Sequence, residues 1–290
     1  MTLPRALPWL DERRSALLAE IGLPPWWQPR ALLPGAALPS ARPPAPPPPA
    51  ASSSPPAAPP PMAPQRVPTV PAPEPRAAAA PETPAWDWPA LVQAIEACQR
   101  CGLGACRQRA VAGVGDRQPD WLIVGEAPGE EEDRQGEPFV GRAGRLLDRM
   151  LAALDLQRSH RVYITNVLKC RPPRNRNPEP DEIARCTPYL RRQIALLRPR
   201  IVLALGRFAA QTLLIEGGCL PQEEALRAPL GRLRARVFTA RFDDLQVPVV
   251  VSYHPAYLLR NPADKGKAWA DLCLAADTWS AAVQAGTAAP

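Results

Sequence analysis

The chain has 290 residues, including 41 prolines and 7 cysteines, and a formal net charge of +7 at pH 7. No apolar run approaches the roughly 18 residues that a membrane-spanning helix needs. Charged residues 11–14 interrupt any signal-peptide layout, so we expect a cytoplasmic protein without membrane contact. An odd number of cysteines in such a chain argues against a disulfide framework, and the basic balance is compatible with a polyanionic partner.

Residues 1–33 are predicted to form a short amphipathic helix with a tail. Asp11 can cap its N-terminus, and apolar residues at helical spacing follow until Gly22 ends the pattern. Trp26 and Trp27 come next, and adjacent tryptophans are costly to leave in water. They either anchor a binding partner or fold back on the main domain.

Segment 34–85 is dominated by Pro, Ala and Ser, and 20 of the 41 prolines lie between Pro34 and Pro84. This composition cannot bury enough apolar surface to offset the entropy of ordering, and polyproline II segments keep such chains extended. We therefore expect a disordered linker that ends near Trp86.

Beyond this linker, short apolar runs alternate with helical patterns. The alternation predicts a mainly parallel sheet covered by helices on both faces, which is a three-layer α/β/α sandwich. Strands are expected at 121–125, 161–165, 201–205, 237–240 and 247–252. Helices are expected at 91–99, 141–154, 179–197, 207–215, 255–260 and 263–283, with a loop at 217–235. The domain is expected to span 86–283, followed by a disordered tail at 284–290.

The stretch 122–145, LIVGEAPGEEEDRQGEPFVGRAGR, is the centre of this pattern. Its apolar start is typical of a buried strand that ends in a turn at Gly125. Open α/β sheets bind ligands at the carboxyl ends of their parallel strands. Glu126 therefore either faces a ligand or caps the turn, and Phe139 is either part of the site or ordinary core.

Two further polar residues follow predicted strands, namely Asn166 and His254. An imidazole at a strand end can stabilise negative charge on a leaving group. A lone histidine is more often structural, but His254 shares its placement with Glu126 and Asn166, which favours function. His160 lies in a predicted loop and receives no functional assignment.

Cysteines form two candidate ligand pairs. Cys98 and Cys101 make a C-x2-C pair after a predicted helix, and Cys170 and Cys186 bracket a basic, proline-rich loop. Spacing alone leaves zinc and an iron–sulfur cluster open. Cys106 adds a C-x4-C alternative to the first pair. The two remaining cysteines are interpreted as ordinary thiols.

The loop around Cys170 is strongly basic. Together with Lys169 at its start, it carries Arg171, Arg174 and Arg176. Arginines on a proline-stiffened loop suit phosphate contacts, so we expect this loop to face a phosphate-bearing partner. The alternative is a solvated basic loop.

Four motifs, taken together and in order, resemble the family 4 uracil-DNA glycosylases. They are GEAPGEEED at 125–133, PFVGRAG at 138–144, YITNVLKCRPP at 163–173 and HPAYLLRNP at 254–262. The resemblance runs from about Ala90 to Trp279. It implies an enzyme that removes uracil from single- or double-stranded DNA in base excision repair. It also implies a monomer in a bacterial-type cytoplasm, associated with the nucleoid.

Carried over residue by residue, the resemblance implies a uracil-binding site. Glu126 and Ala127 lie at the base, where Glu126 helps to hold the attacking water. Phe139 stacks on the flipped uracil, and Asn166 pairs with its edge, donating to O4 and accepting from N3. His254 donates toward O2 of the leaving anion. Family 1 enzymes carry a water-activating aspartate where Ala127 stands; family 4 members lack it, so the identity of the base stays open and Glu126 is our interpretation.

The resemblance also implies a cofactor and a DNA-contacting surface. The ligands of a 4Fe-4S cluster would be Cys98, Cys101, Cys170 and Cys186. The DNA contacts would be Arg171, Arg174, Arg176, Leu258 and Arg260, with the leucine-rich segment pressing into the duplex where the base left. A related branch forms a covalent adduct with DNA through a histidine on an inserted arginine-rich loop. The run VVVSYHP lacks such an insertion, so we expect turnover.

Two rival functions are considered. A non-catalytic iron–sulfur DNA-binding adaptor recruited to the replisome would have no need for the intact set of Glu126, Phe139, Asn166 and His254. A nucleotide-binding α/β protein would need a G-x-G-x-x-G motif or a P-loop lysine, and both are missing. Residues 1–33 loosely resemble the N-terminal peptide of the psi subunit of bacterial DNA polymerase III. That likeness implies a clamp-loader or other replisome partner.

Overall fold

The computed structural model describes residues 86–287 together with Ala16, Ala19 and Glu20, which are helical. The rest of the peptide 1–33 and the whole linker 34–85 lie outside the described residues, so the predictions made for them stay predictions. The tail was predicted to be disordered from residue 284. This is wrong at its start, because the last helix continues to Thr287.

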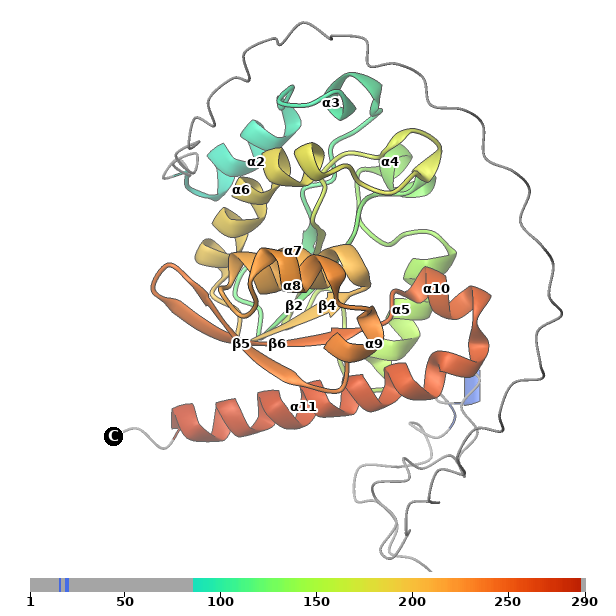
Figure 1. Ribbon diagram of the computed structural model, residues 1–290, viewed down its shortest axis with the longest axis vertical. Coiled ribbons are helices and arrows are strands. Elements are labelled where there is room, and N and C mark those ends of the chain that lie inside the picture. The colour runs from blue at the N-terminus through green and yellow to red at the C-terminus, as the bar shows by residue number, and fades with distance from the viewer. Residues whose placement is uncertain (1–15, 17–18, 21–85, 288–290) are drawn as a thin grey trace, which may run out of the picture. The chain divides into compact units, whose positions relative to one another are not determined.

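A six-stranded sheet forms the centre of the described domain (Figure 1). Its strands are β1 (Val114–Gly115), β2 (Trp121–Gly125), β3 (Val162–Asn166), β4 (Ile201–Leu205), β5 (Val237–Phe242) and β6 (Leu245–Ser252). Their order is β1-β3-β2-β4-β6-β5. The four inner strands are parallel, and β1 and β5 are antiparallel edges. The expected mainly parallel sheet is confirmed.

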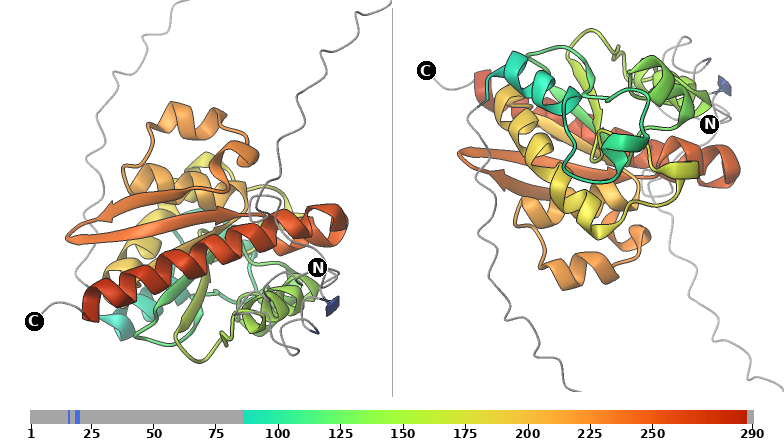
Figure 2. Two further views of the ribbon diagram at one scale, coloured as in Figure 1. Left: turned by 90° about the horizontal axis from the view of Figure 1, so that it is seen from below. Right: turned by 90° about the horizontal axis from the view of Figure 1, so that it is seen from above.

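Helices cover both faces of this sheet. They are α2 (Trp88–Glu96), α3 (Leu103–Cys106), α4 (Glu130–Gln135), α5 (Arg142–Ala152), α6 (Pro180–Leu197), α7 (Arg207–Glu216), α8 (Gln222–Arg227), α9 (Leu230–Leu233), α10 (Pro255–Arg260) and α11 (Lys265–Thr287), with 3-10 turns η2 (Pro173–Asn175) and η3 (Pro262–Asp264). In Figure 2, α11 crosses in front of the sheet in one view, and α2 and α6 lie in front in the opposite view.

Successive side chains of the inner strands point to opposite faces of the sheet, so the hydrophobic core is divided into two layers. Leu122 and Val124 of β2 pack with α2, α6 and α7, whereas Trp121 and Ile123 pack with α5, α10 and α11. All four side chains are at most 1% exposed. A sheet buried on both faces explains why its strands are continuous apolar runs, and it confirms the three-layer α/β/α sandwich.

The predicted loop 217–235 contains two helices instead, α8 and α9. Both are short, and each follows a proline, Pro221 or Pro229, at its N-cap. Proline signals a loop in sequence, but its fixed φ also suits the start of a helix. The first helix begins at Trp88, three residues earlier than predicted, because Asp87 accepts a hydrogen bond from the Ala90 N–H at 3.0 Å.

Candidate active site

Polar residues that follow β2, β3 and β6 meet at one edge of the sheet. Glu126 follows β2, Asn166 ends β3, and His254 follows β6 and begins α10. These three line one cavity of about 770 Å³, together with Ala127 and Phe139. The structure therefore brings together all five residues that the resemblance assigned to uracil.

Asn166 presents an unused amide to this cavity. The residue is 1% exposed, and neither Oδ1 nor Nδ2 has a hydrogen-bond partner among the described residues. Leaving a buried amide unpaired costs about 1–3 kcal/mol per polar group, so such groups are expected to meet a ligand or water. The amide offers one acceptor and two donors to a planar polar partner.

Phe139 lies beside that amide in an uncommon backbone conformation. Its φ is 56°, and Arg158 holds the turn by donating to the carbonyl oxygens of Pro138, at 2.8 Å, and of Phe139. The phenyl ring is stacked on the imidazole of His254, with ring centroids 5.3 Å apart and planes 29° apart. A strained residue held by its surroundings is typical of a binding site.

His254 is a neutral hydrogen-bond donor in this arrangement. Its Nδ1 accepts from the Ala256 N–H at 3.2 Å, which leaves the proton on Nε2. The His254 side chain is partly exposed to the cavity. Burial of the ring still lowers the pKa of His254 to about 4, and the nearby positive charge of Arg260 adds a smaller effect in the same direction. At neutral pH the ring therefore donates without carrying a positive charge.

Glu126 and Glu132 divide two roles between them. Burial raises the pKa of Glu126, and the positive charge of Arg207 opposes that rise. Glu132 accepts from the N–H groups of Val140 and Gly141, each at 3.0 Å, and so ties α4 to the start of α5. Glu126 is the carboxylate left to act on a ligand or a water molecule.

Four cysteines line a second, smaller cavity, namely Cys98, Cys101, Cys170 and Cys186. Cys106 is exposed and does not line it. Within residues 86–287, no group of three or more His, Cys, Asp or Glu side chains is placed to hold a metal ion. The four thiols thus line one small cavity, with an open volume of about 10 Å³.

Cationic side chains surround the same cysteine cavity. Arg107 Nη1 donates to Cys170 Sγ at 2.9 Å, and the Lys169 N–H donates to Cys186 Sγ at 3.3 Å. Arg100 and Arg185 also line it. N–H donors and positive charge near sulfur stabilise the thiolate form that metal ions and clusters bind.

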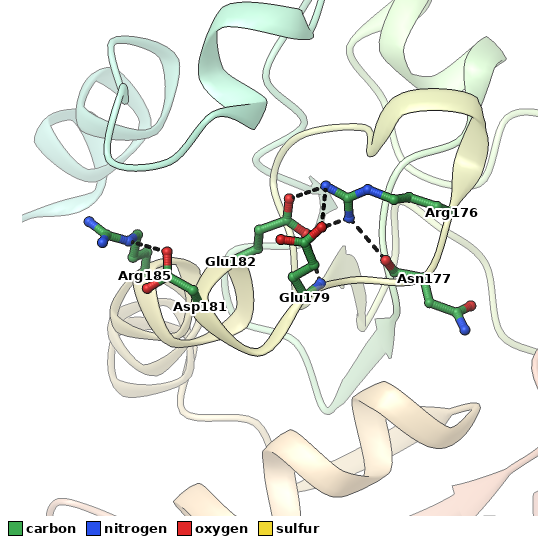
Figure 3. Close-up of polar contacts among 6 residues, drawn as sticks. All are labelled: Arg176, Asn177, Glu179, Asp181, Glu182 and Arg185. Carbon is green, nitrogen blue, oxygen red and sulfur yellow. Dashed lines mark hydrogen bonds and ion pairs between the residues drawn. The ribbon is translucent and has the colours of Figure 1, made fainter. Parts of the chain in front are cut away.

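Arg176, predicted to contact DNA, is engaged within the protein. Its guanidinium forms a two-point ion pair with Glu182, at 2.6 and 2.9 Å, and also bonds Glu179 and the Asn177 carbonyl (Figure 3). Its side chain still lines the active-site cavity. The pair is part of what fixes the loop to the start of α6.

The other predicted DNA contacts differ in exposure. Arg171 is half-buried and donates to Asn175 Oδ1 at 2.7 Å. Arg174 is exposed, with a φ of 55°, and Arg260 is exposed at the cavity. A phosphate in solution could therefore contact Arg174 and Arg260 directly, whereas Arg171 is less accessible.

Two expectations for this surface are wrong. Lys169 was grouped with the basic loop, but it is 1% exposed. Leu258 was assigned to DNA, yet it is 1% exposed and packs against Leu146 and Met150 of α5. Leu259, at 37% exposed, is the leucine of this segment that reaches the surface.

Sequence reasoning did not single out three residues that line the cavity, namely Arg207, Tyr253 and Tyr257. Arg207 follows β4, so its position after a strand end was the signal that could have found it. Tyr253 and Tyr257 stack on each other with centroids 4.8 Å apart, a contact between a strand end and a helix that no spacing reveals.

A parallel sheet with a carboxylate, an amide and a stacked imidazole at its strand ends defines an α/β enzyme site for a small planar polar ligand. The sequence model of the Uracil DNA glycosylase superfamily matches residues 112–273. The type-4 uracil-DNA glycosylase of Archaeoglobus fulgidus is 42% identical over 172 residues, which cover 59% of this chain and 83% of the relative. That of Pyrobaculum aerophilum is 41% identical over 63% of this chain and 90% of the relative. That of Thermotoga maritima is 37% identical over 59% and 82%.

The chain belongs to the uracil-DNA glycosylase superfamily and, within it, to the type-4 uracil-DNA glycosylases. No helix in the described part of the chain is both long and apolar enough to cross a membrane.

Proposed function

We propose that this protein hydrolyses the N-glycosidic bond of uracil in DNA and leaves an abasic site for base excision repair. The observation that carries the proposal is the buried, unpartnered amide of Asn166 beside the stacked rings of Phe139 and His254. A uracil flipped out of the strand would stack on Phe139 and satisfy that amide. Family membership supports the same reaction.

Base selection follows from the amide's chemistry. Asn166 Nδ2 donates to uracil O4, and Oδ1 accepts from the N3–H. Cytosine presents a donor in place of O4 and a lone pair in place of the N3–H, so both hydrogen bonds would be lost. A site built to hydrogen-bond one base edge rejects a base that leaves its polar groups unpaired.

Bond breaking requires charge stabilisation on both sides of the bond. As the C1′–N1 bond opens, negative charge grows on the uracil ring, and the neutral His254 donates from Nε2 toward O2. The sugar becomes oxocarbenium-like, and the Glu126 carboxylate orients a water molecule toward C1′ and takes up its proton. Burial raises the pKa of Glu126, which suits it to act as a base near neutral pH.

We also propose that Cys98, Cys101, Cys170 and Cys186 hold a 4Fe-4S cluster. Four thiols that line one cavity, with N–H donors to two of the sulfurs, supply the ligands, and the resemblance to the family 4 enzymes favours a cluster over a single zinc ion. When bound, the cluster would cross-link the segment after α2 to the loop that carries Cys170. Anaerobically purified protein should contain about four irons per chain, as one such cluster implies. Stoichiometric zinc without acid-labile sulfide would contradict the assignment.

The DNA path is proposed to pass Arg174 and Arg260, with Leu259 at the position that the flipped base leaves.

Residues 1–33 are proposed to bind a clamp-loader or other replisome subunit, tethered by the linker 34–85. Deleting residues 1–85 should leave activity on oligonucleotides nearly unchanged and abolish capture by the clamp-loader ATPase subunit in a pull-down. Equal capture of the full-length and truncated proteins would exclude this partner.

The reaction is tested with a duplex oligonucleotide that carries one deoxyuridine. After incubation, hot alkali should cut the strand at that position, because abasic sites are alkali-labile. The non-catalytic adaptor alternative predicts binding to the same oligonucleotide without any cut. Asn166→Asp should weaken excision sharply, since a carboxylate cannot donate to O4.

A further inference from the structure

Lys169 is a buried lysine that lies between the two sites. Burial lowers its pKa to about 8, against the attraction of the two nearby cysteines. Its Nζ donates to the Asn166 carbonyl oxygen at 2.6 Å, to Thr165 Oγ1 at 2.8 Å and to Gln193 Oε1 at 2.7 Å. Three acceptors match the three donors of an ammonium group, which offsets the cost of removing it from water.

The acceptors around Lys169 are themselves fixed. Thr165 Oγ1 donates to the Ala112 carbonyl at 2.8 Å, and Gln193 Nε2 donates to the same oxygen at 2.7 Å. Thr165 and Gln193 are fully buried. The ammonium therefore sits in a closed network that joins β3, α6 and the segment before β1, and a satisfied buried network of this kind is rigid.

The main chain of Lys169 reaches toward the cysteines. Its N–H donates to Cys186 Sγ at 3.3 Å, its carbonyl accepts from the Val111 N–H at 2.8 Å, and Cys170 is the next residue. Lys169 thus bonds through its main chain to Cys186, which lines the cysteine cavity, and through its side chain to Asn166, which faces the active-site cavity. Its burial excludes direct contact with a DNA phosphate.

We propose that Lys169 is a positioning residue for base recognition, which fixes the main chain of Asn166 so that its amide keeps one orientation toward the base edge. The inference rests on the proposed function of this site. The Asn166 amide has no hydrogen-bond partner among the described residues, so its direction depends on the main chain that carries it. The peptide group that joins Asn166 to Val167 is held at both of its polar atoms: the Val167 N–H donates to the Gly125 carbonyl at 3.0 Å, and the Asn166 carbonyl accepts from the ammonium.

The test measures base discrimination in binding. Two otherwise identical oligonucleotides carry 2′-fluorodeoxyuridine or 2′-fluorodeoxycytidine at one position, where the fluorine slows cleavage. The ratio of the two dissociation constants is measured for the anaerobically purified wild type, Lys169→Met, Asn166→Ala and the double variant. Iron content and visible absorption are recorded for each, so that loss of metal is seen separately. Gln211→Leu removes a buried amide that bonds α7 to α8, and serves as the matched control.

Lys169→Met should lower the uracil preference about tenfold, the size expected for one misaligned hydrogen bond. In the Asn166→Ala background the same change should alter the ratio less than about twofold, because coupled residues are not additive. Gln211→Leu should leave the ratio unchanged. Equal losses in both backgrounds, or an unchanged ratio in a folded Lys169→Met, would overturn the inference.

A milder variant covers the case in which Lys169→Met does not fold. Thr165→Val removes one acceptor of the ammonium and should lower the ratio in the same direction by a smaller amount; an unchanged ratio overturns the inference. A wild type without uracil preference would instead contradict the proposed function, so the two failures are distinguishable.

Discussion

Gly125 and Asn166 lie opposite each other at the ends of β2 and β3, and a methyl group on Gly125 would clash with Asn166 Oδ1. The same methyl group would lie 2.5 Å from the Cζ atom of Phe139. Gly125→Ala should therefore displace the amide and the stacking ring together. We expect uracil excision to fall by about 10²-fold or more, the scale of a 1 Å displacement of a positioning group.

Gly102→Ala is the matched control for this change, because no atom lies within 4 Å of the added methyl group. It should keep both activity and melting temperature. Circular dichroism should show that Gly125→Ala is folded. A folded Gly125→Ala with wild-type single-turnover rate would show that the close approach of these strands has no part in base binding.

His254 should titrate far below an ordinary histidine. The chain has two histidines, so the His254 signal in an NMR titration can be assigned with a His160→Gln variant. We expect His254 to titrate near pH 4, because burial disfavours the charged ring. The folded state then binds fewer protons than the unfolded state between pH 6.5 and pH 4, so this group makes the protein less stable as pH falls through that window. A His254 titration above pH 6 would contradict the neutral-donor assignment.

Replacing His254 should slow chemistry rather than binding. His254→Gln should reduce the single-turnover rate by about 10²–10³-fold, as for other groups that stabilise a developing anion. Affinity for duplex DNA should change little. His160→Gln should match the wild type in both measurements. Loss of affinity without loss of rate would make His254 structural.

Glu126 sets a pH dependence that Arg207 modifies. Activity needs the Glu126 carboxylate in its charged form, so the acid limb of kcat/KM should lie above the ordinary value of 4.5. Arg207 holds that pKa down, so Arg207→Met should move the limb to higher pH. Arg227→Met, which changes an exposed arginine paired with Glu223, should leave the profile in place. A limb that moves to lower pH in Arg207→Met would contradict this account.

Leu258 and Leu259 should separate into a stability effect and a DNA effect. Leu258→Ala should lower the free energy of unfolding by about 2–5 kcal/mol, because it empties a core position. Leu259→Ala should change stability by less than about 0.5 kcal/mol, as expected for an exposed side chain. It should slow excision from duplex DNA more than from single strands. A side chain that fills the gap left by the flipped base can act only where the neighbouring bases are stacked in a duplex. Equal effects on both substrates would remove Leu259 from that role.

The strand ends could be predicted from sequence because apolar runs and turn residues are local signals. β2 and β4 were placed at their observed bounds, and Glu126, Asn166 and His254, which were predicted to share a strand-end placement, line one cavity. The burial of Lys169 could not be foreseen, because a lysine beside arginines has the same local pattern whether it is solvated or enclosed. Two of its acceptors, on Thr165 and Asn166, are near in sequence, but the third, Gln193 Oε1, comes from α6 and is supplied only by tertiary packing.

Two other differences also depend on tertiary contacts. A six-residue helix such as α10 has too few turns to fix its phase, so Leu258 and Leu259 were equivalent until α5 was seen to cover one of them. The partner of Arg176 is Glu182, on a different element, and a basic loop gives no sign of it. The fold follows from periodicity, whereas the exposure of individual side chains follows from which elements meet.

The most direct measurement is the release of free base from a duplex that carries uracil, thymine or cytosine at one position. Wild-type protein in excess should release uracil alone, detected by mass spectrometry. Asn166→Ala and His254→Gln should each release it far more slowly from the same duplex. Release of no base by the wild type, or equal release by Asn166→Ala, would contradict the claim that this cavity excises uracil.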